Sequence, residues 1–69
     1  MTPIQYRAAI KKLSLSQNGA ARFLGVHSRT SQRWALGELP VPLAVEMLFR
    51  LMLTLNIGPE WFSGRNKEA

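Results

Sequence analysis

The stretch SQNGAARFLGVHSRTSQRWALG, residues 16–37, decides how this chain folds. Its pattern predicts two short helices joined by a tight turn. Ala20 and Ala21 fall on the inner face of the first helix, and Trp34 falls on the inner face of the second. Gly25 lies between the helices, where the chain must turn sharply, usually with a positive φ that glycine adopts without steric cost. The methyl side chain of Ala21 lets the helices cross closely, because a larger group would push them apart.

The second helix of this stretch is expected to present a basic and amide-rich outer face. Ser28 is predicted as its N-cap, and Gly37 is predicted to end it. Guanidinium and amide groups are the side chains that pair with base edges and phosphates. The outer face has no carboxylate among its four polar residues: Arg29, Thr30, Gln32 and Arg33. The sequence therefore predicts a surface suited to a polyanion.

Charge is distributed unevenly along the 69 residues. Residues 1–37 contain six Lys or Arg and no Asp or Glu, whereas residues 38–69 contain three basic and four acidic side chains. The formal net charge of +5 therefore comes from the half that holds the two predicted helices. A basic block of this kind favours phosphate backbones through counterion release, whatever the base sequence.

Length and composition also limit which classes of protein this chain can belong to. A chain of 69 residues without cysteine is expected to form one small domain without disulfides. No apolar segment typical of a secretion signal begins the chain, and the most apolar stretch, residues 41–55, is interrupted by Glu46 and Arg50. It is shorter than the roughly 20 residues that a membrane-spanning helix needs. We therefore expect a cytoplasmic protein without membrane contact.

Catalysis is not expected from this set of side chains. The chain has one histidine, His27, no Cys and no Asp, and its four glutamates are scattered. One histidine without thiolates does not provide the usual ligands of a metal site. We predict no enzyme activity, no cofactor and no metal.

The flanking sequence predicts further helices. Thr2 as N-cap and Pro3 at the first helical position predict a helix over residues 3–13. Ser16 is the predicted N-cap of the helix over 17–24. A fourth helix is expected over 42–55, starting at Pro42, and a short helical turn over 59–62. The resulting fold class is all-α, a compact bundle of four to five helices, with one domain over residues 1–62 and a polar tail over residues 63–69.

Five positions resemble the lambda repressor and Cro-like helix-turn-helix family, known as the XRE type: Gln17, Ala21, Gly25, Val26 and Trp34. The sequence RWALGELPVP, residues 33–42, is also similar to the way chains of that family leave the recognition helix. The resemblance covers residues 15–55. It implies a small bacterial or phage DNA-binding protein that regulates transcription, with a helix-turn-helix as its DNA-binding element.

One position departs from the family pattern. The family usually has a β-branched apolar residue where this chain has Ser31. A serine there can bond back to a backbone carbonyl one turn earlier. If Ser31 is buried against Ala21, Ser31→Val is expected to stabilise the fold; marked destabilisation would mean that the serine is exposed or that its hydroxyl is needed.

The resemblance implies that the N-terminal end of the second helix enters the major groove of double-stranded DNA. Ser28, Arg29 and Gln32 are the implied base-reading residues. Arginine pairs with guanine and glutamine with adenine through two hydrogen bonds each, which agrees with these residue types. Contacts to the groove wall or to phosphate are implied for six further residues: Gln17, Asn18, Arg22, Thr30, Arg33 and Gly37.

A second functional class remains open. The helix over 42–55 is apolar on most of its surface, and Trp61 follows it. We expect this helix and the C-terminal apolar surface to form a homodimer that addresses two half-sites. Alternatively, the same surface binds another protein, and the chain is an interaction module such as an antitoxin or an adaptor. RNA binding is a weaker alternative, because the aromatic residues lie in patterns typical of a core.

Overall fold

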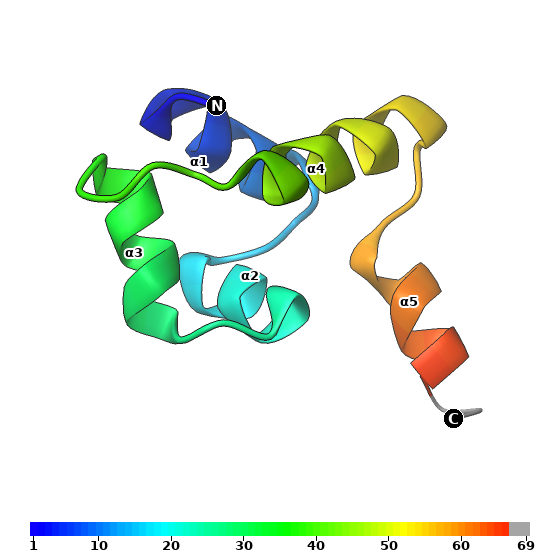
Figure 1. The fold of residues 1–69 in the computed structure, drawn as a ribbon. Helices are drawn as coiled ribbons and strands as arrows, with labels where there is room; N and C mark the ends of the chain where they lie inside the picture. Colours follow the sequence, from blue (N-terminus) through cyan, green and yellow to red (C-terminus); the bar gives the residue numbers. More distant parts are fainter. Residues whose placement is uncertain (67–69) are drawn as a thin grey trace.

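The computed structural model describes the backbone of residues 1–66 and the side chains of residues 1–62 (Figure 1). The described part contains five helices and no strand, which confirms the all-α prediction. The helices are α1 (Pro3–Lys12), α2 (Gln17–Leu24), α3 (Ser28–Leu36), α4 (Leu43–Leu55) and α5 (Pro59–Asn66). Helix α5 continues four residues beyond the predicted helical turn over 59–62. The end of the predicted polar tail, residues 67–69, lies outside the described residues.

Helix α1 is the centre of the packing, because it contacts α2, α3 and α4. Figure 1 shows α1 and α4 along one side of the molecule, α2 along the other, and α3 closing one end. Helix α5 stands at the opposite end from α3. Its Phe62 packs edge-on against Phe23 of α2, with ring centroids 5.3 Å apart.

Local capping chemistry sets where the helices begin and end. Thr2 and Gln5 form a reciprocal capping box at the start of α1, with hydrogen bonds of 2.9 and 3.1 Å. The Ser16 side chain accepts a hydrogen bond from the Gly19 N–H at the start of α2, as predicted. Gly25 has φ of 72° and ends α2 in the left-handed conformation. Helix α4 begins at Leu43 rather than at Pro42, which acts as the N-cap residue.

The predicted N-cap of α3 is wrong by one residue. His27 is the N-cap residue, with an extended backbone, and Ser28 is the first helical residue. The His27 Nδ1 atom accepts a hydrogen bond from the Arg29 N–H at 3.3 Å. The cause lies in the preceding turn, where the Val26 N–H donates to the Ala21 carbonyl and closes the end of α2. The carbonyl of His27 then accepts the first bonds of α3, from the N–H groups of Thr30 and Ser31, so the helix begins directly after His27.

The core is formed around three aromatic rings. Tyr6 of α1 packs edge-on against Trp34 of α3, with ring centroids 5.7 Å apart, and stacks on Phe49 of α4 at 6.0 Å. All three side chains are buried. The prediction that Trp34 belongs to the core is confirmed. Trp34 holds the inner face of α3 against α1, and Tyr6 joins α1 to α4 in turn, so these contacts fix the orientation of α3.

A buried polar pair crosses this core. Ser31 is completely buried, and its Oγ lies 2.6 Å from the hydroxyl oxygen of Tyr6. The serine hydroxyl therefore pairs with a side chain of α1, and this reverses the expectation that valine would stabilise the fold at a buried position 31. Burial raises the pKa of Tyr6, and the hydrogen bond to Ser31 opposes part of that rise. Each hydroxyl satisfies the other where no water can reach.

An ion-pair group joins the start of the chain to α4. The Met1 ammonium lies 2.6 Å from one carboxylate oxygen of Glu46, and Arg50 lies 2.9 Å from the other. Glu46 and Arg50 are four residues apart and so lie one turn from each other on α4, whereas the Met1 ammonium reaches Glu46 from the start of the chain. The hydrogen bond from the ammonium and the nearby positive charges hold the pKa of Glu46 below its ordinary value.

The lowered pKa of Glu46 predicts a pH-dependent contribution to stability. A carboxyl group whose pKa is lower in the folded state stabilises the fold while ionised, and loses that effect as pH falls through the folded-state pKa. We expect the melting temperature of the 69-residue chain to drop more below about pH 4.5 than that of Glu46→Gln. Circular dichroism melts at neutral and acidic pH measure this difference. Glu60→Gln is the control and should keep the full pH dependence; identical curves for Glu46→Gln and the unaltered chain would contradict the prediction.

Within the part of the chain that the structure describes, no helix combines the length and the apolar run that crossing a membrane requires.

Candidate nucleic-acid interface

The outer face of α3 carries the three predicted base-reading residues side by side. Ser28, Arg29 and Gln32 are all exposed. Positions 28, 29 and 32 share one side of a helix because residues three and four apart lie one turn from each other. The opposite side of α3 is buried and consists of Ser31, Trp34 and Ala35. The core therefore holds the helix by one face and leaves the polar face turned outward.

A shallow hollow of about 470 Å³ lies along this outer face. Arg29 and Gln32 line it from the first turns of α3, and Leu36 lines it near the end. His27 and Glu38 border it from the segments before and after the helix. His27 is exposed, and its ring also caps α3 at the edge of this hollow.

The prediction of a face without an opposing carboxylate is wrong at one position. Glu38 follows the C-cap of α3, and its Oε1 lies 3.7 Å from the Nε of Arg33. Arg29 and Gln32 remain exposed and are covered by neither another helix nor this glutamate. Arg33 therefore has an ion-pair partner in Glu38, whereas Arg29 and Gln32 line the same hollow without pairing with it.

The N-terminal end of α2 supplies a second set of polar groups. Asn18 is exposed and Gln17 is half-buried. Ser16 accepts the Gly19 N–H, so within the described residues the N–H groups of Gln17 and Asn18 keep no acceptor inside the chain. Unpaired N–H groups at the start of a helix are favourable partners for a phosphate. Arg22, one turn further along α2, is also exposed.

Two of the predicted contact residues are partly occupied inside the chain. The N–H of Gly37 points back to the carbonyls of Arg33 and Trp34 and ends α3, so that amide is not presented outward. A Cβ at Gly37 would come within 3.0 Å of Pro3, so this position is packed against the start of α1. Thr30 is half-buried along α3. Gly37 therefore belongs to the end of α3 and Thr30 to its half-buried side, and neither lies on the outer face of the helix.

The basic residues of α1 differ in whether they bond to the rest of the chain. Arg7 of α1 donates a hydrogen bond to the carbonyl of Ala35 and so holds the last turn of α3 to α1. Lys11 and Lys12 are exposed in the last turn of α1. Arg7 is therefore a structural cation, and charge counting along the sequence cannot distinguish it from Arg22 or Arg29.

An apolar stripe lies on the exposed side of α4. Its four side chains recur every four residues and are between 55 and 68% exposed: Leu43, Met47, Leu51 and Leu55. A broad hollow of about 620 Å³ follows the same side of the helix, with Arg50 and Thr54 at its border. A row of large exposed apolar residues on a small domain is a feature typical of interaction surfaces.

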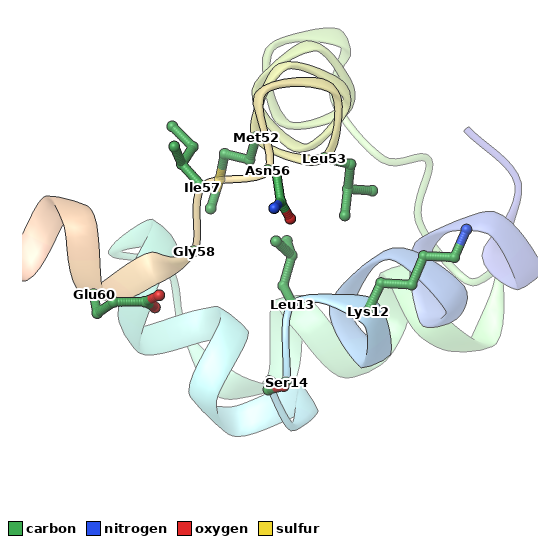
Figure 2. A pocket seen from close by; sticks show the side chains of 9 residues that line it. All are labelled: Lys12, Leu13, Ser14, Met52, Leu53, Asn56, Ile57, Gly58 and Glu60. Atoms are coloured by element: carbon green, nitrogen blue, oxygen red, sulfur yellow. The ribbon is translucent and has the colours of Figure 1, made fainter.

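A smaller cavity of about 240 Å³ lies where α1, α4 and α5 meet (Figure 2). Leu13, Met52 and Ile57 form its apolar wall. Figure 2 shows the Asn56 amide and the Glu60 carboxylate turned toward it, while the Lys12 ammonium points away. Among the described residues, no three His, Asp or Glu side chains gather closely enough to hold a metal ion.

Comparison of the chain with protein-family models, with curated proteins and with solved structures finds no match.

Proposed function

We propose that this chain binds double-stranded DNA in a sequence-specific manner through the outer face of α3 and acts as a small transcriptional regulator. The observation that carries the proposal is the exposure of Arg29 and Gln32 on a helix whose opposite face is fixed in the core. Pairing with base edges needs side chains held on a rigid element that can enter the major groove. The turn at Gly25 and the small residue Ala21, which resemble the lambda repressor and Cro-like family, support the same function.

Each group has a defined role in the proposed complex. Arg29 donates two hydrogen bonds to O6 and N7 of guanine, and Gln32 pairs with N6 and N7 of adenine. Ser28 contacts a base edge beside them at the start of α3. The free N–H groups of Gln17 and Asn18 bind a phosphate and set the register of α3 in the groove.

The test of this function is a selection of bound sequences from a pool of random duplexes. A recovered motif with two related half-sites about 34 Å apart supports both base reading and a two-fold symmetric dimer. Binding of the recovered site should weaken steeply as salt is raised, because phosphate contacts release counterions. Recovery of no motif, together with binding that salt barely changes, would reject the proposal.

We also propose that the apolar stripe of α4 is the homodimer surface. A two-fold axis brings the same patch of each copy together, so a row of apolar residues without an internal charge is complementary to itself. The stripe, Leu43 to Leu55, meets this condition, and the charged pair of Glu46 and Arg50 lies beside it. The alternative, in which the same stripe binds a different protein, predicts a monomer in isolation.

A charge in the middle of the stripe is expected to separate the copies. Leu51 is 55% exposed, so Leu51→Lys removes no core contact but places an ammonium in the proposed interface. Sedimentation equilibrium should show a dimer for the unaltered chain and a monomer for the variant. Ile4→Lys is the matched control on α1, where the side chain is 71% exposed, and should leave the dimer intact. A monomeric unaltered chain at high micromolar concentration would favour the protein-interaction alternative.

A further inference from the structure

Glu38 is the first acidic residue of the chain and lies directly beside the proposed DNA-binding face. Gly37 ends α3 with a φ of 80°, which turns the chain back along the helix. The Glu38 N–H then donates to the Arg33 carbonyl at 2.9 Å. This backbone hydrogen bond fixes the position of the Glu38 backbone. Glu38 borders the same hollow as Arg29 and Gln32.

The contact between Glu38 and Arg33 is incomplete. Its 3.7 Å separation is longer than the 2.7–2.9 Å typical of a charge-assisted hydrogen bond. Among the described side chains, the Nε of Arg33 is a buried nitrogen without a hydrogen-bond partner. Both side chains are otherwise well exposed, at 41% for Arg33 and 59% for Glu38. Exposed pairs of this kind are weak and readily exchange partners.

We propose that Glu38 is a positioning residue that holds Arg33 away from phosphates and so limits the affinity of this face for DNA of arbitrary sequence. The inference rests on the proposed function of α3. A phosphate that binds the guanidinium of Arg33 competes with the nearby carboxylate for this positive charge, and the carboxylate also repels it. Arg29 and Gln32 line the same hollow but form no ion pair with Glu38, so the proposal predicts that the non-specific part of the affinity is reduced more than base reading is.

The experiment measures binding of a random-sequence duplex at 50 and 200 mM salt. Glu38→Gln keeps the shape of the side chain but releases Arg33, so the affinity at 50 mM should rise about three- to tenfold. One additional phosphate contact steepens the slope of log affinity against log salt by about 0.9, so the gain should shrink about threefold at 200 mM. In an Arg33→Ala background, Glu38→Gln should lose most of its effect.

Glu60→Gln is the matched control because it makes the same change of net charge on α5, at the opposite end of the molecule from α3 (Figure 1). It should alter the affinity by less than twofold. A readout without DNA is the NMR signal of the Arg33 Nε–H, which should shift in Glu38→Gln and not in Glu60→Gln. Circular dichroism confirms that both variants fold.

The outcomes separate the two proposals. If the unaltered chain binds duplex DNA and Glu38→Gln behaves as Glu60→Gln does, the role of Glu38 is rejected and the DNA-binding function stands. If Glu38→Gln weakens binding of a selected site, Glu38 contacts the DNA directly and the positioning role is also rejected. If neither the unaltered chain nor Glu38→Gln binds any duplex at 50 mM salt, both proposals fall.

Discussion

Replacing Ser31 by valine is expected to destabilise the fold by about 2–6 kcal/mol. The hydroxyl of Tyr6 loses its 2.6 Å partner and stays buried, which costs about 1–3 kcal/mol. The larger valine side chain must also enter a site where Ser31 is completely buried, and overpacking adds about 1–3 kcal/mol. A core of this size supplies about 3–5 kcal/mol in total, so a large fraction of the variant should be unfolded. Urea titration followed by the fluorescence of the buried Trp34 measures the loss.

A double-mutant cycle isolates the hydrogen bond from the packing. Ser31→Ala and Tyr6→Phe should each destabilise by about 1–3 kcal/mol, because each leaves one buried hydroxyl unpaired. The double variant removes both hydroxyls and should be more stable than the sum of the single losses implies. Ser28→Ala, at an exposed serine of the same helix, is the control and should change stability little. A valine variant as stable as the unaltered chain would show that the hydroxyl is dispensable.

Features set by neighbouring residues could be predicted from the sequence. The turn at Gly25 depends on one backbone conformation, and the burial of Trp34 and Ala21 follows from their spacing on helices. Ser16 and Thr2 cap their helices through bonds to residues three positions later. In each case the cause and the effect lie within one or two helical turns, where residue type and spacing carry the information.

Contacts between distant residues could not be predicted in this way. Tyr6 and Ser31 are 25 positions apart, and the sequence presents each as an ordinary residue of its own helix. The Met1 ammonium reaches Glu46 only because α1 and α4 pack together. The charge pattern correctly marked residues 1–37 as basic, yet it does not show that the guanidinium of Arg7, although the residue is exposed, donates a hydrogen bond to the carbonyl of Ala35. The packing of the helices therefore decides which of several similar basic side chains bond within the chain and which are left to bind a partner.

In the candidate site, too, the features that follow from helical spacing could be predicted, and the contact with a residue beyond the helix could not. Exposure of Arg29 and Gln32 follows from the helical period, since Trp34 fixes which face is inside. The acidic neighbour of Arg33 does not follow from that period, because Glu38 lies beyond the helix. Only the left-handed turn at Gly37 brings its carboxylate back to α3. A glutamate one residue after such a C-cap is the signal that would have indicated the contact.

Arg29→Ala is expected to reduce discrimination between the selected DNA site and random duplex by about 1–3 kcal/mol, or roughly five- to 150-fold. Arg29 is exposed at the start of α3 and, unlike Arg33, has no acidic partner among the described residues. Its two proposed hydrogen bonds to one guanine exist only when that base is present. The loss should therefore be concentrated at one base pair of each half-site. Titrations of the selected site, of the site changed at single base pairs and of random duplex, all at one salt concentration, measure it.

Lys12→Ala separates this effect from a simple loss of positive charge. Lys12 is exposed at the end of α1, away from the outer face of α3, and its ammonium can act on DNA only through the phosphate backbone. Its removal should weaken every duplex by the same factor and leave discrimination unchanged. If Arg29→Ala behaves in the same way, with equal losses on selected and random DNA, Arg29 binds phosphate. Base reading would then have to be assigned to residues other than Arg29, because an interaction common to all sequences cannot contribute to their discrimination.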